Sequence, residues 1–231
     1  KLAEEYLEII SLRQKSFLKN TLLLEELDRR KIDNLFTKKL ENTYKLFDES
    51  KLKNEKFFRD LHILNDMEIL FHSMRDRRNG FPKYYSAIEN LDKFYIIQKL
   101  KKIIIITNEE RTTARVVKEK GEMESFIKLI QKNKYFEFPV IQILYNIFML
   151  SRDSKKEYFE NLKKIIAEHK NQISEEELEW VYFTMMNFCI QQINMGKNEY
   201  AKEELEIYKY IIQDNLLLYN STLESNLFKN I

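Results

Sequence analysis

The chain is poor in the residues that interrupt helices. Its 231 residues include only three glycines and two prolines. A strand-rich fold needs turn residues at intervals of about 8–12 positions, whereas a chain of helical hairpins needs far fewer. Between these few breakers, apolar residues recur at helical spacing. The sequence therefore predicts an all-α fold.

Cysteine and long apolar runs are also scarce. Cys189 is the only cysteine, so the chain can form no internal disulfide and has no CxxC pair for zinc. We therefore expect a reducing compartment, the cytoplasm. The longest apolar candidate, 138–150, is too short to cross a bilayer and contains Gln142 and Asn146. We expect no membrane contact, and we leave open whether a signal peptide precedes Lys1.

An excess of either charge is missing too. Thirty-nine basic residues against thirty-seven acidic ones leave a net charge of +2. Nucleic-acid-binding domains usually show a strongly basic face, so we expect no nucleic acid partner. The chain also lacks a glycine-rich phosphate loop, GxSxG and HExxH. His62 and His72 fall on one predicted helix but lie about 15 Å apart along it, too far to share an ion unaided. We expect no enzyme activity, no cofactor and no metal site.

What the chain does contain is a series of apolar stripes with helical period. Ser154, Ser174 and Ser221 each precede a glutamate by three positions, a pattern typical of a capped helix start. Gly121 and Gly196 predict helix ends. The stripes place helices over 2–30, 34–47, 55–75, 83–106, 123–132, 139–150, 154–169, 178–195 and 198–213.

Two features of this series leave alternatives open. The run Ile103–Ile106 has four β-branched residues, which prefer a strand, but the spacing of Ile96, Leu100 and Ile103 favours a helix. The stripe that begins after Ser221 is cut off by the end of the chain. We therefore expect this chain to be a piece of a longer protein.

The predicted helices come in pairs. In the clearest pair, Gly196 ends one apolar helix and Tyr200–Ala201 begins the next, as in tetratricopeptide-type hairpins. There the alanine would allow close helix approach. The spacing between Gly196 and Tyr200 departs from that consensus by two residues. A weaker match to the segment that begins at Tyr200 lies at 35–40. We expect antiparallel hairpins stacked as a tetratricopeptide-like solenoid or superhelix, one domain over 1–231 with a possible boundary near 109–121.

Several segments carry a resemblance to known proteins. The runs 182–193, 200–210, 216–218 and 228–231 resemble a group of uncharacterised, long all-helical proteins from Bacteroidetes. The resemblance implies an all-helical fold and a bacterial source. It implies no activity, because none is assigned to the group.

Aromatic and amide side chains are the first candidates for partner binding. Tyr84 and Tyr85 offer contact area at low entropic cost, although aromatic residues at helical spacing more often pack in a core. Asn187 falls within an apolar helix and can hydrogen-bond a peptide backbone. The alternative for Asn187, and for Asn146, is a satisfied amide in the core.

The densest basic cluster is the second candidate. Arg75, Arg77 and Arg78 fall in a predicted loop and could contact a phosphate or an acidic partner. The alternative is a solvated loop. Together these candidates favour a helical-repeat scaffold that binds a protein or peptide. The alternative function is a peptide-sensing regulatory domain whose output domain lies outside this fragment.

Overall fold

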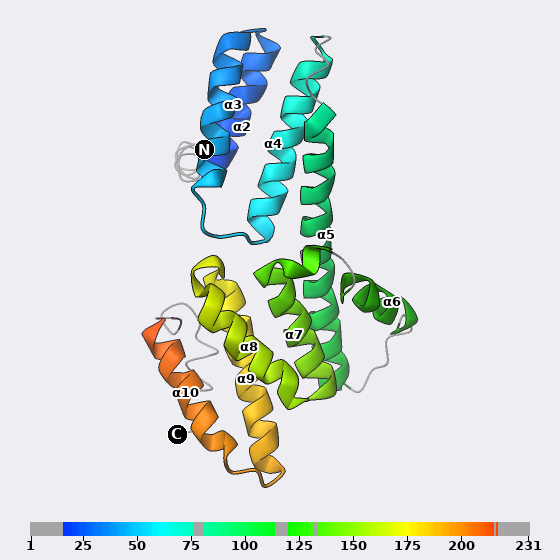
Figure 1. Ribbon diagram of the computed structural model, residues 1–231, viewed down its shortest axis with the longest axis vertical. Coiled ribbons are helices and arrows are strands. Elements are labelled where there is room, and N and C mark those ends of the chain that lie inside the picture. The colour runs from blue at the N-terminus through cyan, green and yellow to red at the C-terminus, as the bar shows by residue number, and fades with distance from the viewer. Residues whose placement is uncertain (1–15, 76–80, 114–119, 132–133, 215, 217–231) are drawn as a thin grey trace, which may run out of the picture. The chain divides into compact units, whose positions relative to one another are not determined.

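The computed structural model describes residues 16–75, 81–113, 120–131, 134–214 and 216 of the chain. Within these ranges every regular element is a helix: nine α-helices and two short 3-10 helices, with no strand (Figure 1). The predicted all-α class is confirmed. The chain divides into two compact units, residues 1–95 and 96–231, here called the N-terminal and C-terminal units.

The N-terminal unit is built on a core of leucine and phenylalanine. The rings of Phe36 and Phe71 stack with their centroids 3.9 Å apart, and both side chains are buried. Leu24, Leu40 and Leu64 complete the centre of this core. Its helices are α2 (Ser16–Arg29), α3 (Asp33–Asp48), α4 (Glu55–Ser73) and the part of α5 (Phe81–Thr113) up to residue 95.

The C-terminal unit is a run of helices in which sequence neighbours contact one another. α7 contacts α8 and also α9, and α9 contacts α10. α7 is buried on almost all sides, as its apolar sequence predicts for a helix packed between others. The elements are α5 from residue 96 onward, α6 (Lys120–Gln131), η2 (Lys134–Glu137), α7 (Pro139–Asp153), α8 (Lys156–His169), η3 (Lys170–Gln172), α9 (Glu175–Asn194) and α10 (Tyr200–Gln213).

Local chemistry sets several of the helix boundaries. Asn54 caps α4 by accepting a hydrogen bond from the Phe57 backbone, and Ser174 and Glu177 form the predicted capping box of α9. Gly196 follows α9 with φ +84°, a conformation that favours glycine. These starts and this end agree with the sequence prediction.

Two predicted boundaries are wrong. Ser154 does not cap α8; it closes α7 with φ 50°, and Lys155 occupies the N-cap position without a side-chain hydrogen bond. Gly121 does not end a helix but lies in the first turn of α6. The potential cap at Ser221 lies outside the described residues.

Burial decides the two remaining predictions about packing. The run Ile103–Ile106 lies inside α5, where Ile103 and Ile104 are buried, so tertiary contacts outweigh its strand preference. Ala201 is exposed, so it does not mediate the close helix approach that we expected. The neighbouring Tyr200 is buried instead, with its ring edge-on to Phe188.

Candidate functional site

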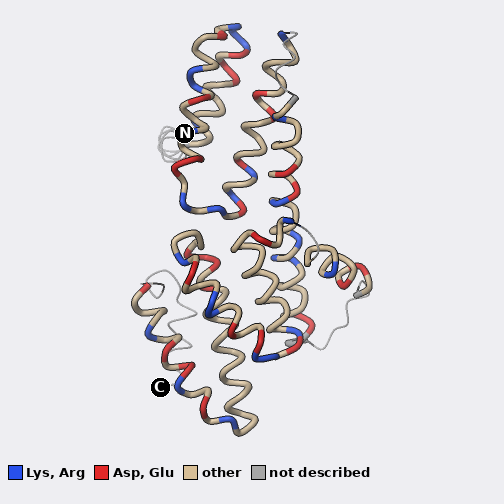
Figure 2. The backbone as a smooth tube through the Cα atoms, viewed as in Figure 1, with Lys and Arg blue, Asp and Glu red and all other residues tan. Residues whose placement is uncertain are grey.

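Two uncharged stretches of chain meet at a hollow in the C-terminal unit. Residues 138–151 and 180–196 contain no lysine, arginine, aspartate or glutamate. They form most of α7 and of α9, which are accordingly tan in Figure 2, while charges of both signs are interleaved along the other helices. The hollow lies beside the C-terminal end of α7 and has a volume of about 610 Å³. We call it the amide hollow.

The amide hollow combines amides, hydroxyls and apolar side chains. Among the described residues that line it, none is charged. The amides belong to Asn108, Asn187, Gln191 and Asn194; the hydroxyls to Ser151, Ser154 and Thr184; and the exposed apolar surface to Phe183 and Met195.

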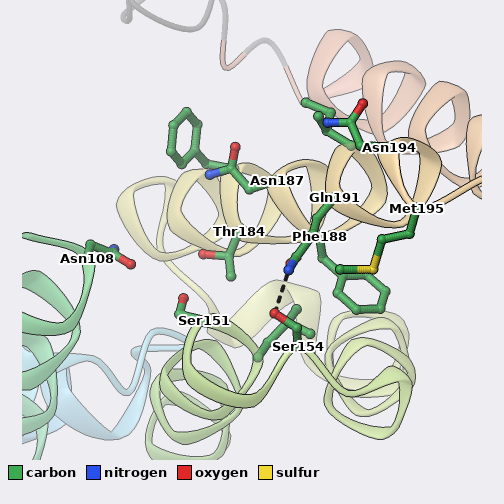
Figure 3. Close-up of a pocket in the computed structure, with 12 residues that line it drawn as sticks. Asn108, Ser151, Ser154, Thr184, Asn187, Phe188, Gln191, Asn194 and Met195 are labelled. Atoms are coloured by element: carbon green, nitrogen blue, oxygen red, sulfur yellow. Dashed lines mark hydrogen bonds between the residues drawn. The ribbon is translucent and has the colours of Figure 1, made fainter. Parts of the chain in front are cut away.

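Three helices position these polar groups. Thr184 extends from α9 toward Ser151 on α7, and Asn108 projects from α5 (Figure 3). Ser154 donates a hydrogen bond of 2.8 Å from its hydroxyl to Oε1 of Gln191, drawn as a dashed line in Figure 3. Thr184 donates to the backbone carbonyl of Trp180 at 2.8 Å. The hollow thus has a partly fixed polar wall.

A stripe on α9 gives the hollow an exposed face. Phe183, Asn187, Ile190 and Asn194 follow one another at intervals of three or four positions, so they share one side of the helix. Asn187 and Asn194 are exposed, and Phe183 is 40% exposed. Each amide offers both a donor and an acceptor. This stripe can therefore pair with neutral polar groups while contacting apolar ones.

The structure gives Asn146 and Asn187, which we considered together, different surroundings. Asn146 is buried; its amide donates to the Gln142 carbonyl at 2.8 Å and accepts from Asn161 at 3.2 Å. Its interpretation as a satisfied core amide is confirmed. The same interpretation is wrong for Asn187, which is exposed at the amide hollow.

The candidate tyrosines lie in the other unit. Tyr84 and Tyr85 are 47% and 67% exposed on α5, so they are not core residues. They belong to the N-terminal unit, whereas Asn187 belongs to the C-terminal one.

Arg75 is engaged within the N-terminal unit. Its Nε donates to Asp33 Oδ1 at 2.7 Å, and its Nη1 lies 2.7 Å from Asp28 Oδ1 in an ion pair without hydrogen-bond geometry. Its guanidinium also lies over the Phe71 ring, 3.9 Å from the centroid. These contacts tie the end of α4 to α2 and α3. Arg77 and Arg78 lie outside the described residues.

The histidines of α4 contact other groups of the N-terminal unit. His62 Nδ1 lies 3.1 Å from the Ala87 carbonyl, and its Nε2 lies 3.4 Å from Asp66. His72 lies 3.9 Å from Glu68. Over the part of the chain that the structure describes, no three histidine, cysteine or acidic side chains are grouped to hold a metal ion. In that same part, no helix has the length and apolar character needed to cross a membrane.

Sequence reasoning missed most of the amide hollow. It singled out Asn187 but not Gln191, Asn194 or the hydroxyls of Ser151 and Thr184. A signal for part of it exists, because amides recur at 187, 191 and 194 within an uncharged stretch. No model of a protein family matches this chain, and neither a curated protein nor a solved structure matches it either.

Proposed function

We propose that this protein is a cytoplasmic helical-repeat scaffold that binds an extended, uncharged peptide segment of a partner protein in the amide hollow, without catalysis. One observation carries the proposal: four amides and three hydroxyls line a hollow of about 610 Å³ to which no described charged residue contributes. The tetratricopeptide-like arrangement is part of the proposal. It is supported by the contact between α7 and α9, two helices along, as expected for stacked hairpins.

Amide side chains suit a peptide backbone because both carry N–H donors and a carbonyl acceptor. Asn187 and Asn194 stand seven positions apart on α9, about 10 Å along its axis. Two residues of an extended peptide span about 7 Å and three span about 10 Å. Backbone groups about three residues apart in an extended segment can therefore reach both side chains.

A lining without charge among the described residues selects against charged ligands. A charged side chain that enters such a hollow loses water and gains no opposite charge, which costs several kcal/mol or more. Neutral backbone groups can exchange hydrogen bonds with water for hydrogen bonds with the amides. Apolar side chains of the peptide can pack on Phe183 and Ile190, which line the same hollow.

A phage-displayed library of random short peptides, panned on the 1–231 chain, tests the proposal. Selected peptides should be poor in charged residues, and Asn187→Ala should weaken a selected peptide about tenfold, the effect of one or two lost hydrogen bonds. Asn198→Ala, an exposed asparagine outside the amide hollow, is the matched control. Enrichment of charged peptides, or equal binding by the two variants, would reject this site.

A further inference from the structure

A second hollow, in the N-terminal unit, gathers three buried polar side chains from three helices. Asn20 on α2, Thr43 on α3 and Asp60 on α4 are 9%, 1% and 4% exposed. All three line a hollow of about 240 Å³ whose apolar walls include Phe17, Phe47 and Phe57. We call it the aromatic hollow. It is separate from the amide hollow and does not depend on the function proposed above.

The polar groups of the aromatic hollow are only partly satisfied. Asp60 Oδ1 accepts two hydrogen bonds from Arg59, at 3.0 and 2.8 Å, while its Oδ2 accepts none from any described residue. Thr43 donates to the Lys39 carbonyl at 2.8 Å, which leaves its oxygen as an acceptor. The Asn20 amide makes no hydrogen bond to a described residue. None of these three residues has an atom among the described buried atoms that lack any partner, so their oxygens line the hollow with acceptor capacity left for a ligand.

We propose that the aromatic hollow binds a primary alkylammonium group. Such a group has three N–H donors, and the hollow offers three acceptors from three helices: Asp60 Oδ2, Asn20 Oδ1 and Thr43 Oγ1. The negative faces of the phenylalanine rings favour a cation, and their apolar edges favour the alkyl chain. An anion would meet the buried Asp60 carboxylate there, while Lys56, the one cation among the described lining residues, is exposed.

The surrounding charges are compatible with a cation in this hollow. Lys53 Nζ already lies 4.0 Å from the centroid of the Phe57 ring, so this aromatic surface accepts an ammonium group. Lys56 is exposed and the Arg59 side chain is 46% exposed, so water and salt screen both charges. The Asp60 side chain is only 6% exposed and is screened far less.

Isothermal titration of the 1–231 chain with n-butylammonium chloride tests the proposal. Neutral n-butanol and anionic n-butyrate have nearly the same shape and serve as ligand controls. Butylammonium should bind at least about tenfold more tightly than butanol, and butyrate should bind least, because only the cation can donate to the carboxylate. Absence of butylammonium binding, or equal binding of the three ligands, would overturn the proposal, and this comparison needs no variant.

The ammonium group could belong to a free amine or to a lysine of a partner. N-acetyl-lysine methylamide separates these sources: tighter binding than butylammonium supports a lysine side chain, and weaker binding supports a free amine. Either result supports recognition of an ammonium group only if butanol binds more weakly than both of these amines.

Two pairs of variants locate the binding. Asp60→Asn and Thr43→Val should each weaken butylammonium about fivefold or more. Asp66→Asn on α4 and Thr37→Val on α3 are the matched controls, since Asp66 is half exposed and Thr37 makes the same kind of backbone hydrogen bond at an exposed site. Circular dichroism first checks that each variant is folded. If folded Asp60→Asn and Asp66→Asn bind butylammonium equally, the site is not this hollow.

Discussion

At the scale of single residues, Tyr44 carries a polar link inside the N-terminal unit. Its hydroxyl lies 2.7 Å from Asn65 Oδ1 and 2.7 Å from Glu68 Oε2 and can donate to one of them at a time. Burial, together with the bond to Glu68, raises the pKa of Tyr44 well above its usual value, so the hydroxyl stays a donor at neutral pH. The link joins α3 to α4.

Removing this hydroxyl should be costly. We expect Tyr44→Phe to lower the free energy of unfolding by about 1–3 kcal/mol, because Glu68, 14% exposed, loses a donor in a largely desolvated site. Urea unfolding followed by circular dichroism measures the change. Tyr210→Phe, at an exposed tyrosine of α10, is the control and should change stability little. Equal effects of the two substitutions would contradict a special role for Tyr44.

Cys189 allows a prediction about reactivity and pH. It is fully buried, and burial, with Glu204 and Glu203 nearby, raises the pKa of its thiol to about 12. The folded protein should therefore react with a thiol reagent such as DTNB only after unfolding in denaturant. Since the folded thiol holds its proton more tightly than the unfolded one, its contribution to stability is present below about pH 9 and is lost as pH rises toward 12. Rapid reaction of the folded chain at pH 8 would contradict this burial.

At the scale of helices, two identical sequence patterns have different outcomes. Ser174 and Ser154 both precede a glutamate by three positions, but only Ser174 accepts a hydrogen bond from the backbone of that glutamate, Glu177. Ser154 is instead held in a left-handed conformation at the end of α7, where its hydroxyl bonds Gln191, 37 residues away. A local pattern cannot reveal which long-range contact will compete for the serine.

This difference predicts opposite responses to substitution. Ser174→Ala should cost about 1 kcal/mol, the usual loss of a helix cap, whereas Ser174→Gly should cost only a few tenths. At Ser154 a glycine should again cost less than an alanine, but because φ is positive there, not because of capping. Replacing Glu157 by glutamine should leave stability unchanged, while Glu177→Gln should reduce it. Thermal unfolding of the six single variants measures these differences, and an equal loss at Glu157 would contradict the assignment.

Arg75 was predicted to lie in a loop and contact a partner, but in the structure its side chain packs within the N-terminal unit. Its side chain is 15% exposed, and it holds Asp28 of α2 and Asp33 of α3 while stacking on Phe71. We expect Arg75→Lys to cost about 1–3 kcal/mol, because a single ammonium cannot reproduce the fork and the stacking together. Arg29→Lys, at a side chain that is 71% exposed, is the control and should cost much less. Chemical denaturation measures the stability of both variants. Equal losses of stability would show that Arg75 contributes no more than an exposed surface charge.

At the scale of the whole molecule, the sequence predicted the helices better than it predicted the contacts between helices and the sites that these contacts form. The helical class and most boundaries follow from the spacing of apolar residues and the scarcity of breakers, both of which are local properties. The partners of Arg75 are up to 47 residues away in sequence, since Asp28 and Arg75 differ by that number. The walls of the amide hollow come from α5, α7 and α9. Such sites depend on tertiary packing, which helical periodicity does not specify.

The two compact units predict separate responses to core substitutions. Trp180 is the only tryptophan, and it lies in the C-terminal unit, so its fluorescence reports that unit, whereas circular dichroism reports both. Phe159→Ala removes a fully buried ring from the C-terminal unit and should cost about 3–5 kcal/mol, lowering the midpoint of the fluorescence transition in urea. Phe36→Ala removes a ring of similar burial from the N-terminal unit and should leave that midpoint unchanged while shifting part of the circular dichroism transition. An equal shift of the fluorescence midpoint by both variants would mean that the chain unfolds as one cooperative body, coupled through the continuous helix α5.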